Sequence, residues 1–175
     1  DIREMSLFNP ETFQEQLRKH MAETGVALVI CPHLPGTKAH GATFWLSKDK
    51  AVLMITNRGA WADIFWFSLF HEMGHILLHN RQSVILEDDS YAPETQSREA
   101  EADRFAADIL IPPQKYNDFV AKRKFYKDNI CAFAHQIGVD AGIVIGRLQN
   151  DKYIPREWFN DLRKRYKLQN KDLQK

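Results

Sequence analysis

Hydrophobic and polar positions recur with two different periods along this chain, and each change of period marks the boundary of a predicted element. Residues 9–23 carry apolar side chains at a helical spacing, with Phe13 and Leu17 four positions apart on one face. The residues expected to begin and end this helix are an N-cap, a first-turn proline and a terminating glycine, at Asn9, Pro10 and Gly25.

Three short apolar runs follow and predict β-strands, at residues 26–31, 42–47 and 51–56. The last two runs are joined only by "SKDK", which predicts a hairpin, whereas the turn-rich stretch "PHLPGTKAHG" separates the first two. The pattern does not decide which strand forms an edge of the sheet.

The remainder of the chain predicts helices. A long helix is expected to begin with Asp63 as its cap and to end near His79 or Asn80. A polar loop, "EDDSYAPETQS", precedes a second helix from about Gln96 to Ile111, which the following two prolines stop. Three further helical segments are expected: one at 114–126, a pair around a turn at Gly138 within 130–150, and a basic one from Arg156 onward.

This order of elements indicates an α+β fold, in which a small three-stranded sheet is followed by a helical bundle. A length of 175 residues favours a single domain with three parts, at 1–25, 26–112 and 113–175. The first part is a helix and linker, the second holds the sheet and two central helices, and the third is helical. The first residue is Asp1 rather than methionine, so we expect a fragment or a processed form of a longer protein.

Composition narrows the class of protein. The chain is 44% hydrophobic and 27% charged, which is typical of a globular domain. No apolar run is long enough to span a membrane, and no signal peptide begins the sequence. Its two cysteines, Cys31 and Cys131, are interpreted as reduced core thiols. These features predict a cytoplasmic protein without membrane contact.

Charge is divided unevenly. Residues 1–112 carry 10 Lys and Arg against 16 Asp and Glu, whereas residues 113–175 carry 14 against 7. A basic C-terminal third could face nucleic acid or an acidic partner. We prefer the simpler interpretation, which is a solvated helix face.

The stretch "SLFHEMGHILLH" places three histidines and one glutamate in an apolar run. His71, Glu72 and His75 form the pattern H-E-x-x-H, which a chain of this composition would contain about 0.016 times by chance. On a helix the two histidines lie one turn apart on one face, so both imidazoles can reach one Zn²⁺. Glu72 lies about 100° further round the helix, where it can serve as base for a metal-activated water.

These histidines have two other interpretations. They could be hydrogen-bonded histidines of an ordinary core. His75 and His79 are also four residues apart, but this second pair has no glutamate in register and lies at the helix end. We interpret His79 as a C-terminal helix residue that interacts favourably with the helix dipole.

A third ligand is expected from the following helix. Relative to the centre of its apolar face, Glu99 lies about 60° away and Glu101 about 100° away, so Glu99 is the better candidate and Glu101 a solvated residue. Asp103, one turn after Glu99, can orient a ligating histidine through its far nitrogen. Three small residues would allow the two helices to approach closely, namely Gly74, Ala102 and Ala106.

Three segments resemble the ImmA/IrrE family of metallopeptidases: "FWFSLFHEMGHILLH", "EAEADRFAADILIP" and "FAHQIGVDAGIVIGRLQ". The resemblance extends from about Gly41 to Leu148. It implies a zincin-like fold built on the H-E-x-x-H helix, with a gluzincin-like zinc site. Carried over residue by residue, it implies metal ligands at His71, His75 and Glu99, a catalytic base at Glu72, and Asp103 at the matching Asp or Asn position.

The resemblance also implies a biological role. Such proteins are zinc endopeptidases, and several cleave a helix-turn-helix transcriptional repressor in a bacterial stress, toxin–antitoxin or mobile-element response. The expected partner is therefore a protein substrate, with DNA contacted only through a fused or partner domain. By its chemistry, a site of two histidines and one glutamate could also hold Mn²⁺ or Fe²⁺.

The alternative is a non-catalytic, metal-binding regulatory domain of a helix-turn-helix repressor or antitoxin. Residues 130–150 do look like a helix-turn-helix, but Arg147 is the one cation in the would-be recognition helix "DAGIVIGRLQN". We therefore interpret that segment as a packing element.

Two features of catalysis stay open at this level. Substrate backbone could pair with a sheet edge at residues 42–47 or 51–56. The group that stabilises the developing oxyanion could be any of five residues, which are Tyr91, Tyr116, Tyr126, His135 and Arg147.

Overall fold

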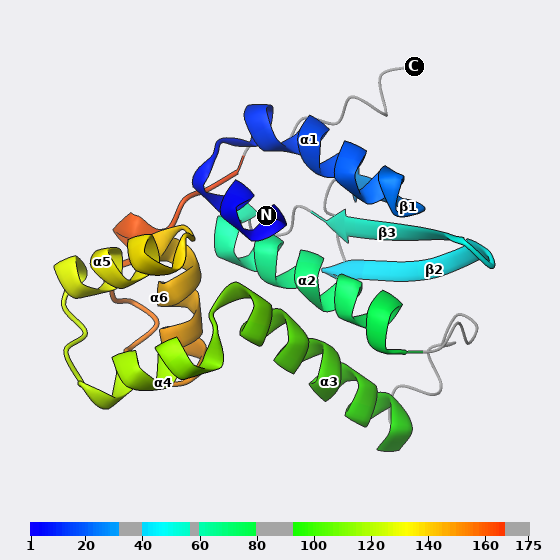
Figure 1. Ribbon diagram of the computed structural model, residues 1–175. Coiled ribbons are helices and arrows are strands. Elements are labelled where there is room, and N and C mark those ends of the chain that lie inside the picture. Colours follow the sequence, from blue (N-terminus) through cyan, green and yellow to red (C-terminus); the bar gives the residue numbers. More distant parts are fainter. Residues whose placement is uncertain (32–39, 57–59, 80–92, 167–175) are drawn as a thin grey trace.

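The computed structural model describes residues 1–31, 40–56, 60–79 and 93–166 (Figure 1). The turn-rich stretch between the first two strands lies largely outside these residues, as does Tyr91. The elements in chain order are η1 (Ile2–Leu7), α1 (Pro10–Glu23), β1 (Val26–Cys31), β2 (Gly41–Ser47), β3 (Lys50–Thr56), α2 (Ala62–Leu78), α3 (Pro93–Leu110), α4 (Pro113–Ala121), α5 (Lys127–Ile137), α6 (Ala141–Asn150) and η4 (Asn160–Leu162). The predicted α+β architecture is confirmed.

The three strands form a mixed sheet in the order β1-β3-β2. Strands β2 and β3 pair antiparallel, which confirms the predicted hairpin, and β1 pairs with β3 in parallel. Because β3 is central, its Leu53 and Ile55 are fully buried. The strand order also shows which strands form the edges of the described sheet, which the sequence pattern left open. Strand β2 lies at one edge, and β3 lies at neither.

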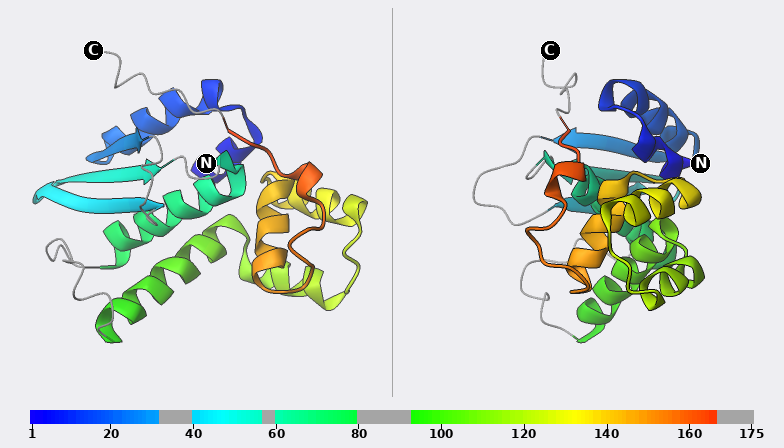
Figure 2. Two further views of the ribbon diagram at one scale, coloured as in Figure 1. Left: turned by 180° about the vertical axis from the view of Figure 1, so that it is seen from behind. Right: turned by 90° about the vertical axis from the view of Figure 1, so that its left-hand side faces the viewer.

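Helix α2 lies between the sheet and α3 (Figures 1 and 2). Thr43 of β2 pairs with Leu53 of β3, so the two side chains share the sheet face that meets α2. Near their N-terminal ends, α1 and α2 also contact each other directly, with the rings of Phe13 and Trp66 5.0 Å apart. Helix α2 is therefore held on several sides.

Helices α2 and α3 approach as closely as the small residues predicted. A Cβ atom added to Gly74 would lie 3.2 Å from the Cα of Ala102 and 3.2 Å from the ring of Phe105. Such contacts are tighter than most real Cβ contacts. The acidic residues of α3 are consequently brought beside the histidines of α2.

The start of α2 differs from the prediction. Trp61, not Asp63, is the N-cap residue, and the helix begins at Ala62. The Asp63 carboxylate instead pairs with Arg163, with an Oδ2–Nη2 distance of 2.7 Å, and both side chains are nearly buried. Burial raises the pKa of Asp63, and the hydrogen bond from Arg163 opposes that rise. An ion pair with a distant residue therefore took precedence over the local capping role.

The predicted basic helix from Arg156 is wrong for the described residues. Residues 156–159 form turns, η4 follows, and the next residues run alongside the start of α2. The guanidinium groups of Arg163 and Arg165 lie 4.5 and 4.1 Å from the ring centroid of Trp61. The Ala62 amide also donates to the Lys164 carbonyl. These stacking and backbone contacts would be lost in a continuous helix. They also engage basic side chains that were expected to be solvated.

Replacing Asp63 with alanine should destabilise the protein strongly. The substitution leaves the Arg163 guanidinium buried without its carboxylate, and breaking such a pair costs about 3–5 kcal/mol. Urea unfolding followed by circular dichroism measures the change. Asp161→Ala, which removes the exposed partner of Lys127, is the matched control and should leave the unfolding midpoint nearly unchanged. Equal shifts in the two variants would contradict the assignment.

Helices α5 and α6 support the packing interpretation of the helix-turn-helix-like segment. Gly138, at φ +74°, makes the turn between them, as predicted. Most of α6 is buried, including Val144, Ile145 and Leu148, so its apolar face is not available to a DNA groove.

Among the described residues no single helix is long and apolar enough to cross a membrane. Helices α5 and α6, which are bent by 113° relative to each other, have the required length and composition only as a pair.

Candidate metal centre

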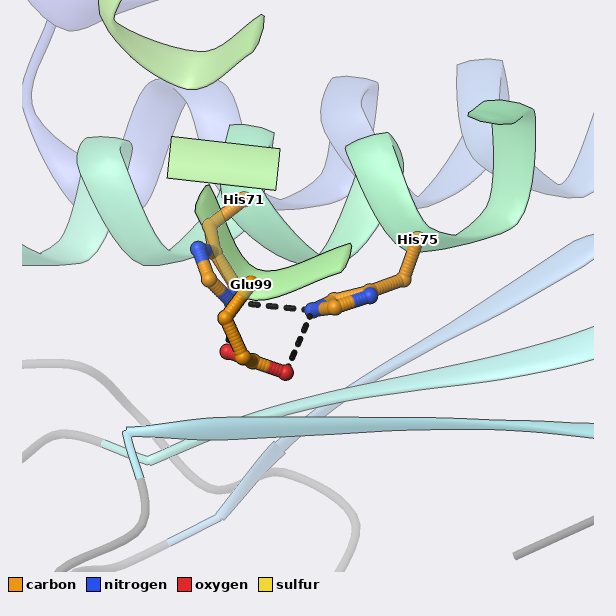
Figure 3. Close-up of side chains that lie close together, drawn as sticks. All are labelled: His71, His75 and Glu99. Carbon is orange, nitrogen blue, oxygen red and sulfur yellow. Dashed lines mark hydrogen bonds and ion pairs between the residues drawn. The ribbon is translucent and has the colours of Figure 1, made fainter. Parts of the chain in front are cut away.

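Three potential ligands converge between α2 and α3. The Nε2 atoms of His71 and His75, one turn apart on α2, are 3.0 Å apart. The Glu99 carboxylate, from α3, lies 3.3 Å from His71 Nε2 and 3.4 Å from His75 Nε2. Figure 3 shows this carboxylate facing both imidazoles. Among the described residues, these three form the one group of His, Cys, Asp or Glu side chains close enough to share a metal ion.

The spacing of the donor atoms of these three side chains fits a metal ion. Two ligand atoms bound tetrahedrally to Zn²⁺ at about 2.0–2.1 Å are about 3.3 Å from each other. The two Nε2 atoms are 3.0 Å apart, and each lies near a different oxygen of Glu99: His71 Nε2 is 3.3 Å from Oε2 and His75 Nε2 is 3.4 Å from Oε1. These separations are close to that value, so the three side chains are near enough to share one metal ion.

Asp103 lies on the opposite side of the His71 ring. Its Oδ1 atom is 2.8 Å from His71 Nδ1, so the ring is held between Asp103 and Glu99. Burial lowers the pKa of His71, but its hydrogen bonds to Asp103 and Glu99 outweigh this effect and raise that pKa to about 10. Hydrogen bonds from His71 and His75 hold the pKa of Glu99 far below its usual range. The carboxylates of Glu99 and Asp103 therefore favour a positive charge at the point where the side chains of His71, His75 and Glu99 meet.

His79 and Glu101 lie outside this group of three. His79 contacts the Nδ1 atom of His75, at 3.0 Å, on the side of the ring away from Glu99. Glu101, expected to be solvated, is half exposed but contacts His79, with 3.3 Å between Oε2 and Nε2. Helical phase alone separated Glu99 from Glu101, but it could not show that Glu101 has a histidine partner.

Glu72 lies on the side of α2 that faces the sheet. Its side chain is buried, and the Thr43 hydroxyl of β2 donates a hydrogen bond of 2.7 Å to its Oε2 atom. Gly41 closes in from the same strand, where an added Cβ would lie 2.7 Å from Glu72 Oε1. Burial raises the pKa of Glu72, which the Thr43 hydrogen bond and the two nearby histidines oppose. A raised pKa makes this carboxylate a stronger proton acceptor.

Sequence reasoning missed both Thr43 and Gly41. Thr43 belongs to the strand predicted at 42–47 and Gly41 directly precedes it, but the pattern connects this strand with substrate binding rather than with support of Glu72. The missing information was the register between the hairpin and α2, which depends on tertiary packing rather than on local pattern.

With Glu72 as the base that the sequence predicts, replacing Thr43 with valine should lower peptide cleavage while metal content stays unchanged. Valine keeps the shape but removes the hydrogen bond that holds the Glu72 carboxylate in place, and misplacing a reacting group costs about 10-fold or more in rate. Rates on one cleavable peptide, measured with metal content for each variant, check the result. Thr43→Ser retains the hydroxyl and should retain most activity; if serine is as damaging as valine, the hydroxyl is not the reason.

Of the five candidates for oxyanion stabilisation, the four that the structure describes are not gathered at this site. The Tyr116 hydroxyl and the Arg147 guanidinium both donate to the Asp151 carboxylate. Burial and the hydrogen bond to Asp151 raise the pKa of Tyr116 above its usual range. Tyr126 is the exposed N-cap residue of α5, and His135 is exposed in its last turn. Tyr116 and Arg147 thus have a structural role in joining α4 to α6, and the oxyanion group stays unassigned.

Comparison with known proteins adds a family to this geometry. A family model described as Peptidase_M78, the IrrE N-terminal-like domain, matches residues 24–149, which is more than half of the chain. No curated protein matches the chain. The matched segment runs from just before β1 to the end of α6, so it contains the sheet, the converging ligands and Glu72.

Proposed function

Because the chain belongs to the Peptidase_M78 family of IrrE N-terminal-like domains, we propose that it is a zinc-dependent endopeptidase. One observation carries this proposal. His71, His75 and Glu99 converge on a single point. Glu72, which directly follows His71 on α2, is buried beside them. Three protein ligands with a neighbouring base are typical of a catalytic site, whereas structural zinc sites usually have four protein ligands.

The donor set suits Zn²⁺, and two imidazoles with a carboxylate also suit Mn²⁺ or Fe²⁺. When bound, the metal would supply an activated water and polarise the carbonyl of the peptide bond. The chain itself contributes the orientation of the ligands. Asp103 fixes the ring of His71, which leaves Nε2 of that ring free to face the metal.

Glu72 supplies the proton transfer in this proposal. Its carboxylate accepts a proton from the attacking water and then delivers it to the leaving amine. Burial strengthens it as a base, and Thr43 with Gly41 holds it in place. The residue therefore needs no direct contact with the metal to perform its role.

Strand β2 is the proposed position for the substrate backbone. It lies at an edge of the described sheet, and its Thr43 already contacts Glu72. A peptide added as a further strand beside β2 would have main-chain hydrogen bonds to it and would lie next to the base. The other strand considered, β3, is paired on both sides and is excluded.

The proposed substrate is a helix-turn-helix transcriptional repressor. This part rests on the family resemblance of the three sequence segments. The test incubates the metal-loaded protein with the repressor encoded beside it and measures fragment masses. Discrete fragments, absent after chelation of the metal, are expected; an intact repressor beside a cleaved generic peptide would contradict the choice of substrate but not the activity.

The alternative function is a metal-binding regulatory domain that keeps the site without using it. The helix-turn-helix-like pair α5–α6 is the feature that favours it. Because α6 is mostly buried and Arg163 and Arg165 are stacked on Trp61, we expect this chain alone to bind duplex DNA weakly and in a salt-sensitive way. Tight, sequence-selective binding in a gel-shift assay would favour the regulatory interpretation instead.

A further inference from the structure

We propose that His79 and Glu101 are positioning residues of the metal centre, which hold the imidazole of His75 with its Nε2 atom directed at the metal. The inference rests on the proposed metal site, but it does not depend on peptide cleavage. It concerns His79 and Glu101, two titratable side chains next to the site that have no role in the proposed mechanism.

The contacts form a chain from α2 to α3. His75 Nδ1 lies 3.0 Å from His79 Nδ1, and His79 Nε2 lies 3.3 Å from Glu101 Oε2. The rings of His75 and His79 are 5.1 Å apart, close enough to pack as well as to hydrogen-bond. Both ligating histidines are consequently linked on their Nδ1 side to a carboxylate of α3: His71 directly to Asp103, and His75 through one intervening imidazole.

The direction of every hydrogen bond in this chain follows from metal binding at His75. A ring that gives its Nε2 lone pair to a metal must carry its proton on Nδ1. His75 Nδ1–H then donates to His79 Nδ1, so the proton of neutral His79 is on Nε2. That Nε2–H donates to the Glu101 carboxylate. The carboxylate thus selects the tautomer of His79 that can accept from His75.

The burial of His79 supports a role beyond the end of a helix. Its side chain is only 9% exposed, although it is the C-cap residue of α2. A buried imidazole needs partners at both ring nitrogens, and the two partners here are a proposed ligand and a carboxylate. Interaction with the helix dipole, which the sequence predicts for His79, would need neither contact.

The first test compares two substitutions of His79. His79→Phe keeps a ring of similar size but removes the acceptor, whereas His79→Asn can place a side-chain oxygen where Nδ1 lies. Affinity for Zn²⁺, measured on the full chain by competition with a chromophoric chelator, should fall about 10- to 100-fold in His79→Phe. His79→Asn should recover most of that loss. The absorption spectrum of the Co²⁺-loaded protein should shift in His79→Phe, because the orientation of His75 changes.

The second test asks whether Glu101 acts through His79. Glu101→Gln replaces the charge-assisted hydrogen bond from His79 with a weaker neutral one, so it should weaken Zn²⁺ binding when His79 is present and should have no further effect in a His79→Phe background. Asp108→Asn, which removes an exposed charge from the same helix, is the matched control and should leave affinity unchanged. Because Glu101 is half exposed, its substitution does not threaten folding.

The outcomes separate this inference from the proposed function. Wild-type affinity in His79→Phe, or equal losses from Glu101→Gln in both backgrounds, would overturn the positioning role while leaving the peptidase proposal intact. Weakened binding with rescue by His79→Asn supports the role, even if no peptide is cleaved. Failure of the unsubstituted protein to bind Zn²⁺ or Co²⁺ would overturn both.

Discussion

Glu72→Gln should leave the protein folded and loaded with metal but lower peptide cleavage at least about 10²-fold. Glutamine has nearly the same shape as glutamate and can still accept the hydrogen bond from Thr43. It cannot accept a proton near neutral pH. Because His71 and His75 lie with Glu99 on one side and Glu72 faces β2, the substitution removes basicity without removing a ligand.

The measurement is a matched pair of proteins, with or without Glu72→Gln, assayed on one cleavable partner with metal content determined in each. Glu94→Gln, an identical chemical change at an exposed position on α3, controls for charge. Equal cleavage by the wild type and Glu72→Gln would sink the mechanism. Loss of metal from Glu72→Gln would instead make Glu72 a ligand.

The second large effect is expected at Glu99. Elemental analysis of the wild type should find about one transition metal ion per chain, lost on chelation. Glu99→Ala should lose most of that metal, because the site would then have one ligand fewer and the two remaining imidazoles carry no negative charge. Glu101→Ala should retain it under saturating metal, and its contribution through His79 should appear only in the affinity.

If the two results are reversed, the choice of Glu99 over Glu101 is wrong, and the metal would have to lie on the His79 side of His75. Circular dichroism of both variants controls for folding, since the two glutamates are comparably exposed and neither belongs to the core. The comparison is sharp because the residues differ by only two positions on the same helix.

Short-range patterns were sufficient for much of the fold. The three strands, the hairpin, α1 and the end of α2 depend on spacing, turn residues and local apolar periodicity, all of which are visible in sequence. The close approach of α2 and α3 could also be predicted, because small residues, Gly74 on α2 and Ala102 on α3, were expected to face each other. Helical phase then directed Glu99, rather than Glu101, toward the two histidines.

What sequence could not show depends on contacts between distant segments. Asp63 matched a local capping pattern, but its partner is 100 positions away at Arg163. Arg163 and Arg165 matched a solvated basic helix, but Trp61 provides a stacking surface for both. The support of Glu72 by Thr43 likewise depends on register rather than on composition. In each case the local pattern permitted two structures, and a tertiary contact selected one.

The contact between Gly74 and Ala102 has a consequence in the language of coordination chemistry. In the proposed metal site, α2 would act as a bidentate nitrogen arm and α3 as an oxygen arm, and the separation of the two helices would set the bite of the chelate. A residue larger than glycine at position 74 would push against the Ala102 backbone and widen that bite. The range of ionic radii that the proposed site accepts, and with it the preference among divalent metals, would thus depend on the absence of a side chain at position 74.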